Sequence, residues 1–508
     1  MKLCDLRGCR LYYAYILVFC FTIYIPLFGM IILPSETVSA LEKRKLAEFP
    51  AFGLETIDAF PKSFETFFAD HLGFRDLFTL VNSGIKILAF QKSPVDWMLP
   101  GKDGWLYYTG ESSMDDVLGK ASLKQAELEK WRISLQGKSN WLNRQGIRYF
   151  FMIAPDKQTI YPEYLPDYIQ SRHAPQKRLD QFLSHMQDRS DVPILDVRAD
   201  LTAAKKNHQI YYRTDTHWNW SGGWIAYQKM MERIAGWFPF VTPISPNRVN
   251  VADMPYKHGD LTMGWGWMMG EREMARWVTQ PCQANPVPRL NERSFEKKCP
   301  GTKLRAIVWR DSFLMLIEPF LSESFNQVIY VWQPNYDHHL MKQLVAEIQP
   351  DLVIEERIER SLGAAPELTL EERFDYSSIT AFSQNRDTGH ADILANWEVK
   401  LEHGKDGLLI HATGEDPSIL LPPVTGSSLP LFLHIHLWSP DDTVMQVFYP
   451  TGVDRAYQED MSIACPVRQG DNHLYLEIDK TFPSGRFRLD PGGLKGNYLI
   501  QAVEMRTG

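Results

Sequence analysis

The sequence predicts an α/β domain with a mainly parallel sheet, followed by a β-sandwich of the jelly-roll type. Between residues 148 and 354, buried strand patterns alternate with helix patterns, which is typical of a parallel sheet flanked by helices. From about Leu368 the chain shows short alternating segments separated by turn residues, with no sustained helix, which indicates antiparallel strands. The length of 508 residues suits two or three domains.

The N-terminal part predicts a single membrane anchor. Residues 11–33 are almost uninterruptedly apolar, which is about the length needed to cross a bilayer. Lys2, Arg7 and Arg10 precede this run, so the positive-inside rule places residues 1–10 in the cytoplasm and the rest of the chain outside. A signal peptide cleaved after the Val-Ser-Ala sequence that follows is the alternative, although the apolar run is longer than such peptides usually have.

Hydrophobic periodicity predicts the elements of the α/β domain, which we assign to residues 41–362. Helices are expected at 41–91, 122–144 and 175–186, from Ser221, after Ser312 with a kink at Pro319, and at 340–348. A turn leads into a strand at 101–108, and further strands are expected at 148–154, 192–197, 304–309, 327–332 and 351–354. Ser122 and Gln125 have capping-box spacing. A linker at 363–366 precedes the β-domain of residues 368–508.

The composition argues against several classes of partner. The formal net charge is −8 and the sequence pI about 6.0, so the chain has no basic excess with which to bind nucleic acid. The segment Gly101–Tyr108 lacks the spacing of a phosphate-binding loop, and no cofactor is expected. The 15 tryptophans suit stacking on sugar rings, although tryptophan is also an ordinary core residue.

Two of the six cysteines flank a polar loop. Cys282 and Cys299 enclose a segment rich in Pro, Asn and Arg, which has little core of its own. If the body of the protein lies outside the cytoplasm, where disulfides persist, a bond between these two cysteines is the plausible one.

Asp215, His217 and Ser312 form the candidate catalytic group. Residues i and i+2 of an extended segment point to the same side, so Asp215 is placed to orient His217. A serine hydroxyl becomes a nucleophile when such a histidine acts as its base. Ser312 follows a strand and precedes an expected helix, whose N-terminus would favour an oxyanion. The carboxyl ends of parallel strands meet at one sheet edge, where Lys157 is expected as well.

Other histidines have plainer interpretations. The Asp-x-His pair lacks a third and fourth ligand at convincing spacing, so no metal is expected there. His338 and His339 are assigned to a surface loop. His434 and His436 face one way on an expected strand, either as ligand contacts or, as we prefer, as an exposed polar row.

The stretches D-T-H-W-N and R-D-S-F resemble the signature motifs of the SGNH-hydrolase-like acetyltransferases related to the alginate O-acetylation proteins AlgJ and AlgX. Four further stretches carry the resemblance in the same order: F-A-D-H-L-G-F-R-D, G-K-D-G-W-L-Y-Y, A-P-D-K-Q-T-I-Y-P-E-Y-L-P and P-D-L-V-I-E-E-R-I-E-R. The Asp-x-His motif precedes the serine, as in this family and in the reverse order of ordinary SGNH esterases.

The resemblance implies an SGNH-hydrolase-like fold and an extracytoplasmic O-acetyltransferase with a Ser-His-Asp triad. Ser312 would carry an acetyl group to a hydroxyl of a bacterial exopolysaccharide, after activation by His217. A membrane-bound O-acyltransferase partner would supply the acetyl group, and the β-domain would hold the polysaccharide acceptor. The implied location is the bacterial inner membrane, with the catalytic domain in the periplasm.

One departure concerns Arg310, which stands where ordinary SGNH enzymes have glycine. It is a candidate for shaping the oxyanion site or binding an anionic sugar. Lys157 and Arg213 are further candidates for substrate or oxyanion binding, with a structural salt bridge as the alternative for each. Two other functions stay open: a polysaccharide acetyl esterase with the same triad, and a non-catalytic polysaccharide-binding scaffold of a secretion complex.

Overall fold

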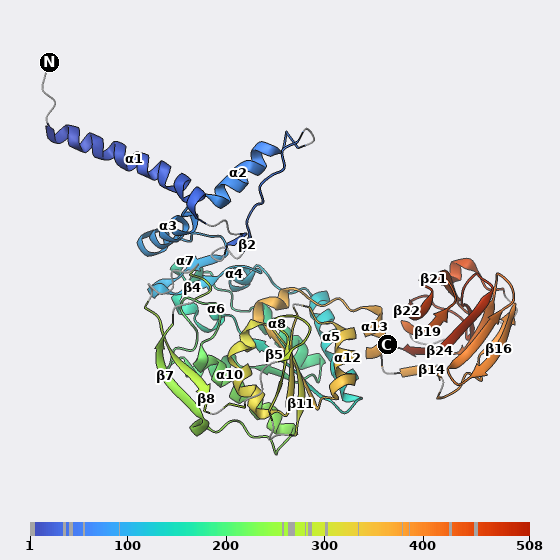
Figure 1. Ribbon diagram of the computed structural model, residues 1–508. Coiled ribbons are helices and arrows are strands. Elements are labelled where there is room, and N and C mark those ends of the chain that lie inside the picture. The colour runs from blue at the N-terminus through green and yellow to red at the C-terminus, as the bar shows by residue number, and fades with distance from the viewer. Residues whose placement is uncertain are drawn as a thin grey trace.

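The computed structural model describes most of the chain and shows a long N-terminal helix, a central α/β body and a β-region to one side (Figure 1). The described residues are 6–33, 37–39, 44–53, 56–90, 92–256, 259–262, 270–279, 281–282, 287–299, 303–333, 335–377, 379–385, 387–425, 429–451 and 456–507. Residues 1–5 of the expected cytoplasmic tail and Leu41, the expected start of the α/β domain, lie outside them.

A seven-stranded sheet forms the centre of the α/β body. Its strand order is β6-β5-β13-β11-β12-β10-β9. Strands β6 to β12 in this order pair in parallel, whereas β10 and β9 are antiparallel, so the sheet is mainly parallel as predicted. The bounds are β5 Arg148–Ala154, β6 Ile194–Asp196, β9 Val287–Pro288, β10 Phe295–Lys298, β11 Arg305–Arg310, β12 Gln327–Trp332 and β13 Leu352–Ile358.

Helices cover both faces of this sheet, which explains why its central strands are continuous apolar runs. Along β5, Phe150 and Met152 face a core that includes α10, while Phe151 and Ile153 face a core that includes α5, α8 and α12. The helices that cover the sheet are visible around it (Figure 1). The helices are α5 Gln125–Asn143, α8 Arg178–Arg189, α10 Trp220–Trp237 and α12 His338–Ile348.

The start of α5 differs from the predicted capping box of Ser122 and Gln125. The helix begins at Gln125, and the carboxylate of Glu127 accepts a hydrogen bond from the backbone N–H of Lys124 at 2.6 Å. The predicted pairing was therefore shifted by two residues along the chain, because acidic side chains satisfy an N-terminal N–H better than an amide does.

The chain after Ser312 forms three short turns and not one kinked helix. They are η5 Ser312–Leu316, α11 Glu318–Leu321 and η6 Ser322–Ser324. Pro319 stands in the first turn of α11, where its missing N–H has no intrahelical partner to lose. The proline thus starts a new turn where a kink was expected.

Residues 41–91, which were predicted to be helical, contain the helices α2 Phe60–His71 and α3 Arg75–Phe90. They are preceded by α1 Leu6–Ile32, at the predicted anchor, and by the short strands β1 Val38–Ser39 and β2 Arg44–Lys45. The turn between α2 and α3 packs against α1, because a Cβ on Gly73 would lie 2.4 Å from backbone atoms of Gly29. Tyr12–Ile32 is long and apolar enough to cross a membrane, a test that a signal sequence near the N-terminus also passes.

The other described elements of the α/β body are short. They are β3 Met98–Pro100, η1 Lys102–Gly104, β4 Leu106–Tyr108, α4 Ser113–Val117, α6 Lys157–Ile160, η2 Pro162–Tyr164, α7 Asp167–Gln170, α9 Arg198–Ala204, η3 Pro246–Arg248, β7 Val249–Pro255, β8 Arg272–Val278 and η7 Glu359–Gly363. Strands β7 and β8 pair as a hairpin beside the main sheet, which the sequence did not predict.

The C-terminal region is a sandwich of two antiparallel sheets, as predicted. One sheet has the order β16-β17-β24-β19-β22, with β14 also paired to β24, and the other has the order β15-β18-β23-β20-β21. Apolar side chains from both sheets form one core between them. The bounds are β14 Ile379–Asn385, β15 Leu394–Trp397, β16 Val399–Gly404, β17 Gly407–Ala412, β18 Ser418–Val424, β19 Leu431–Ser439, β20 Thr443–Phe448, β21 Ser462–Val467, β22 Gly470–Ile478, β23 Gly485–Asp490 and β24 Gly496–Thr507, with η8 Glu459–Met461.

A helix that the sequence did not predict, α13 Leu370–Tyr376, connects the two regions. Tyr376 is buried in the α/β body, where Gly137 of α5 leaves room for its ring: a Cβ there would lie 2.4 Å from the ring carbon Cδ2. Phe374 faces the other way, with its ring 5.4 Å from that of His434. One short helix thus packs on both regions.

Two expectations about histidines were wrong, and α13 contacts His338 in one case and His434 in the other. His338 is buried at the start of α12, with Nε2 2.9 Å from a carboxylate oxygen of Asp375, and does not belong to a surface loop. His434 and His436 are half-buried and not an exposed row. Burial lowers the pKa of His434 to about 3.

Candidate active site

The structure joins Ser312, His217 and Asp215 by hydrogen bonds. Oγ of Ser312 lies 2.7 Å from Nε2 of His217, and Nδ1 of His217 lies 2.6 Å from Oδ1 of Asp215. An ionised carboxylate only accepts, so Nδ1 donates to Asp215 and Nε2 of the neutral ring is left to accept from the serine. This arrangement is the one in which a histidine deprotonates a serine hydroxyl.

The Asp-x-His segment is a compact turn and not the extended piece that the sequence suggested. An antiparallel bridge between Tyr211 and Trp218 closes it, and the backbone N–H of Tyr212 donates to the carbonyl of His217 at 3.3 Å. The backbone N–H of His217 also donates to Oδ1 of Asp215 at 3.0 Å. The turn therefore brings both the backbone N–H and the imidazole Nδ1 of His217 to the carboxylate of Asp215.

Lys157 holds this turn from the carbonyl side. Its buried Nζ donates to the carbonyl oxygens of Tyr212 and Arg213, both at 3.1 Å, and of Asp215 at 2.6 Å. Burial lowers the pKa of Lys157 to about 8, against the opposing effect of Asp215. Its contacts are those of a positioning residue, and the substrate or oxyanion contact considered from the sequence stays a prediction.

Two carboxylates hold the same turn from the N–H side. Glu271 is buried and accepts from the backbone N–H groups of Arg213 and Thr214. Asp260 accepts from the backbone N–H of Thr216 at 2.8 Å and from its hydroxyl at 2.5 Å. Both residues follow or precede strands of the β7–β8 hairpin, and the sequence reasoning missed them because no motif marks them.

Asp215 is held as a carboxylate by several donors. Besides His217, its Oδ2 accepts from the phenol of Tyr256 at 2.7 Å and from the backbone N–H of Asp260 at 3.0 Å. Burial alone would raise the pKa of Asp215, but the hydrogen bond and charge of His217, together with these donors, lower it well below its usual value. Tyr256 is stacked on Tyr212 with ring centroids 3.8 Å apart, which fixes its hydroxyl.

His217 sits among acidic groups. Burial alone would lower its pKa, but the hydrogen bond and charge of Asp215 and the charges of Asp260 and Asp311 raise the pKa above 6.5. Its side chain is 24% exposed, so solvent and substrate reach the ring. A histidine with a raised pKa is a stronger base for the serine proton once it is neutral.

Ser312 is positioned by the residue before it and by the neighbouring strand. Asp311 accepts from the backbone N–H of Phe313 at 2.8 Å and from that of Ile358, at the end of β13, at 2.7 Å. The indole N–H of Trp218 donates to the carbonyl of Phe313 at 2.9 Å, which ties η5 directly to the turn that carries His217. Ser312 is the first residue of η5, so its own backbone N–H has no intrahelical acceptor and can face an oxyanion.

Two glycines at the start of α10 allow the two motifs to approach. A Cβ on Gly222 would lie 2.4 Å from the carbonyl oxygen of Ile210, and a Cβ on Gly223 would lie 2.9 Å from Cβ of Leu316. Because Leu316 belongs to η5, any side chain at Gly223 pushes against the turn that starts with Ser312. The Ser-Gly-Gly sequence after the Asp-x-His motif is therefore part of the site.

Arg310 contacts backbone carbonyl oxygens and an aromatic ring, and the oxyanion or sugar-binding role considered from the sequence stays a prediction. Its guanidinium donates to the carbonyl oxygens of Arg293 and Asp311, at 3.1 Å and 3.3 Å, and lies over the ring of Trp332, 4.7 Å from the ring centre. Burial lowers its pKa. Arg213, the other basic candidate, is half-buried. Its carbonyl oxygen accepts from Lys157, and its backbone N–H donates to Glu271.

Several buried carboxyl groups lie at or just after the carboxyl ends of β5 and β13, next to the segment that carries Ser312. The backbone N–H of Asp311 donates to Glu356 at 3.1 Å, and that of Asp156 donates to Glu359 at 2.7 Å. Burial and the neighbouring charge of Asp156 raise the pKa of Glu359 to about 7. Arg360 pairs with Asp156 at 2.6 Å and neutralises part of this charge. The meeting of strand ends at one edge was predicted, but these residues were not named.

The site has one group that meets the geometry of a metal site. Asp215, His217 and Asp260 offer ligand atoms within 4.8 Å of one another. However, both ring nitrogens of His217 face Asp215 and Ser312, and Asp215 already accepts several hydrogen bonds. The donors present therefore fit a proton-transfer chain better than they fit a bound ion.

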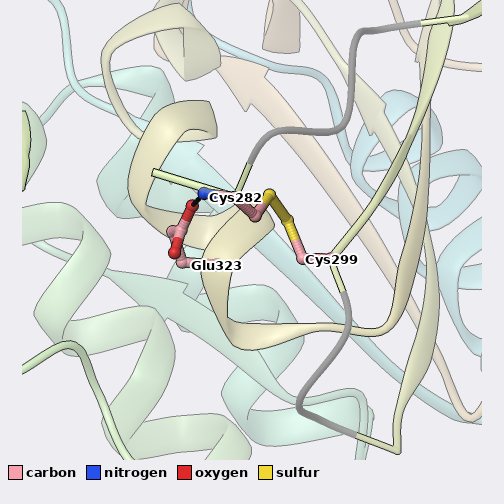
Figure 2. A group of neighbouring side chains, drawn as sticks. All are labelled: Cys282, Cys299 and Glu323. Carbon is pink, nitrogen blue, oxygen red and sulfur yellow. Dashed lines mark hydrogen bonds between the residues drawn. A yellow bond between two sulfur atoms is a disulfide. The ribbon is translucent and has the colours of Figure 1, made fainter. Parts of the chain in front are cut away.

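Cys282 and Cys299 are joined by a disulfide whose Cα atoms are 5.5 Å apart. Figure 2 shows the backbone nitrogen of Cys282 donating to Oε1 of Glu323, at 2.6 Å. Glu323 belongs to η6, so the disulfide-bonded segment lies against the turns that follow Ser312. The disulfide links the two ends of the loop, and the bond to Glu323 holds Cys282 against the body of the domain.

A family model for the SGNH hydrolase-like domain of the acetyltransferase AlgX matches residues 98–287. The chain is related to the alginate O-acetylation proteins. The match includes Asp215 and His217 and ends before Ser312, so the nucleophile rests on the geometry given above.

Curated relatives agree with this relation. The protein named probable alginate O-acetylase AlgJ from Pseudomonas syringae pv. tomato is 30% identical over 250 residues, which is 47% of this chain and 59% of that protein. Its counterpart from Pseudomonas aeruginosa is 29% identical over 135 residues, or 26% of this chain and 31% of that protein. The chain thus matches less than two thirds of the length of these relatives.

Two solved structures of this group are similar over parts of the chain. The O-acetyltransferase domain of Pseudomonas putida AlgJ has a TM-score of 0.36 and 20% identity, covering 53% of this chain and 94% of that one. Pseudomonas aeruginosa AlgX has a TM-score of 0.40 and 12% identity, covering 84% of this chain and 98% of that one. At these values the likeness supports no statement about activity.

Proposed function

We propose that this chain is an extracytoplasmic O-acetyltransferase that moves acetyl groups to hydroxyls of a bacterial exopolysaccharide through an acetyl-Ser312 intermediate. The observation that carries the proposal is the continuous hydrogen-bond path from Ser312 through His217 to Asp215. The names of the relatives, which are called alginate O-acetylases, support an alginate-type polysaccharide as the class of acceptor.

The proposed reaction has two matching halves. In the first, Nε2 of His217 takes the hydroxyl proton as Oγ of Ser312 attacks the acetyl carbonyl, and the donor then leaves with that proton. In the second, His217 takes a proton from a sugar hydroxyl, which attacks the acetyl-serine, and the proton then returns to Ser312. The negative charge that develops on the carbonyl oxygen in each half faces the start of η5.

The other parts of the chain have proposed roles in the same reaction. Residues 41–362 would perform the transfer, and residues 368–508 would hold the polysaccharide. The apolar helix α1 is compatible with a single-pass anchor, which we assign to the inner membrane with the catalytic part in the periplasm. Because acetyl-CoA is absent there, we assign the supply of acetyl groups to a membrane-bound O-acyltransferase.

The test is acetylation of Ser312. The full chain in detergent is mixed with an activated acetyl ester, and the acetyl adduct is measured by intact mass in wild type, Ser312→Ala and the control Ser171→Ala. Ser171 is a helix-end serine whose hydroxyl bonds to a nearby carbonyl. We expect an adduct in wild type and control and none in Ser312→Ala.

Adding an oligosaccharide acceptor then separates transfer from hydrolysis. Acceptor-dependent formation of acetylated sugar supports the transferase, whereas release of acetate at the same rate with and without sugar identifies an esterase. An adduct that persists in Ser312→Ala contradicts the assigned nucleophile. A folded wild-type protein that neither forms the adduct nor hydrolyses the ester favours the polysaccharide-binding scaffold.

A further inference from the structure

The outer face of the sheet formed by β19 and β22 carries a group of ionisable side chains that the proposed reaction does not use. Along β19, Ile435 and Leu437 point into the sandwich core, so His434 and His436 point outward. The antiparallel register places His473 of β22 directly opposite His436.

Close contacts join these side chains into one cluster. Nε2 of His436 lies 2.9 Å from Oδ1 of Asp471, which stands two residues before His473 on the same face. The rings of His436 and His473 are stacked with centroids 3.9 Å apart. Nε2 of His434 lies 3.1 Å from Nδ1 of His473. Three imidazoles and a carboxylate are thereby held by two paired strands.

We propose that His436, Asp471 and His473 bind a late first-row divalent metal ion such as Zn²⁺. Each residue offers one ligand atom, and these atoms lie within 4.8 Å of one another. Zinc bonds of 2.0–2.1 Å in a tetrahedron place ligand atoms about 3.3 Å apart, so binding requires the stacked rings of His436 and His473 to tilt toward a common point. Imidazole and carboxylate are ligands that this class of ion accepts.

His434 has the place of a supporting residue in this site. Its contact with Nδ1 of His473 occupies one ring nitrogen and leaves the other for the ion, which is how hydrogen-bonded partners orient metal-binding histidines. The site is reachable, because the side chains of His436 and Asp471 are 19% and 55% exposed. Three protein ligands leave a fourth position for water or for an oxygen of another molecule.

The same sheet contains a comparison that lacks the third ligand. His411 of β17 contacts the carboxylate of Glu402 at 3.2 Å and the amide oxygen of Asn497 at 2.9 Å. Within the described residues, the contacts of His411 therefore include one carboxylate and no second imidazole, which is one ligand fewer than in the proposed site. His411→Ala is therefore a matched control for the loss of a surface histidine.

The experiment uses the full, untagged chain in detergent, stripped with a chelator and titrated with Zn²⁺ by calorimetry. We expect one equivalent to bind in wild type and in His411→Ala, and this binding to be lost in His436→Ala, His473→Ala and the nearly isosteric Asp471→Asn. His434→Ala should weaken binding by about 10- to 100-fold without abolishing it. Circular dichroism checks that each variant is folded.

Co²⁺ provides an independent readout of ligation. Wild type should show the visible absorption of four-coordinate Co²⁺, and His436→Ala should not. The proposal is overturned if wild type shows no saturable Zn²⁺ binding, or if both His436→Ala and His473→Ala keep it. It is also overturned if binding disappears in His217→Ala or Cys465→Ser, because the ion would then occupy the triad or a free thiol.

Discussion

Gly223→Ala tests whether the approach of α10 to η5 sets the distance between Ser312 and His217. The new Cβ would lie 2.9 Å from Cβ of Leu316 and 3.1 Å from its carbonyl oxygen. The first of these is about 0.5 Å short of the 3.4 Å at which ordinary van der Waals contact begins, so η5 must move by about that amount. Ser312 begins η5 and moves with it.

The expected loss of activity follows from this displacement. A misplacement of about 1 Å costs about 100-fold in rate, so about 0.5 Å should slow acetylation of Ser312 by about 10-fold. That factor corresponds to about 1.4 kcal/mol. Alanine also favours the helix by up to about 1 kcal/mol relative to glycine, which offsets part of the packing cost, so stability should change little.

The assay is the rate of adduct formation with an activated acetyl ester, measured by intact mass beside urea unfolding. Gly236→Ala is the matched control, because Gly236 lies in the same helix and a Cβ there meets nothing within 4 Å. The control should acetylate at the wild-type rate. A Gly223→Ala protein that acetylates as fast as the control would refute the link between this glycine and the serine.

Three further changes probe the site and its surroundings. Asp260→Asn removes a negative charge that raises the pKa of His217; since only the neutral imidazole accepts the serine proton, the acid limb of kcat/KM should lie at lower pH than in wild type. Lys157→Met leaves three carbonyl oxygens without their donor and should lower the free energy of unfolding by about 3 kcal/mol in urea. Cys282→Ala opens a loop closed across 17 positions and should also cost about 3 kcal/mol, measured in the same way.

Each of these changes has its own control and contradiction. An acid limb that stays in place in Asp260→Asn would mean that this carboxylate does not act on His217. Lys102→Met removes an exposed lysine that pairs with Asp167, and Lys157→Met must be clearly less stable than this variant. Cys465→Ala removes a free cysteine, and an equal loss of stability in Cys465→Ala and Cys282→Ala would contradict the role given to the disulfide.

The strands of the α/β body were the most predictable part of the molecule. Those at 148–154 and 327–332 have the predicted bounds, because a strand buried on both faces reads as a continuous apolar run. Helix starts were less accurate, since the backbone N–H of Lys124, just before α5, donates to Glu127, which no periodicity marks. Helix α13 was missed because its seven residues are too few for a periodic signal.

The triad residues were grouped from the sequence because they lie in short motifs of recognisable chemistry, and their catalytic role stays a prediction. The residues that hold them were not found. Tyr256 and Asp260 reach Asp215 from 41 and 45 positions away, through the β7–β8 hairpin, and their side chains belong to no motif. Lys157 was named from its place after a strand, but the bonds of its ammonium group to carbonyl oxygens of the turn were not predicted, because they depend on burial.

The hydrogen bonds that hold the Asp-x-His turn in place have a kinetic consequence. Lys157, Glu271 and Asp260 hold the turn from both sides, so the base is already aimed at Ser312 before any sugar arrives. The side chain of His217 is 24% exposed, so in the proposed reaction water would compete with the acceptor for each acetyl-serine. The quantity that would characterise the proposed transferase is therefore its partition ratio, the number of acetyl groups delivered to sugar for each one lost as acetate. Selection on this protein would act on how quickly the acceptor occupies the site and excludes water.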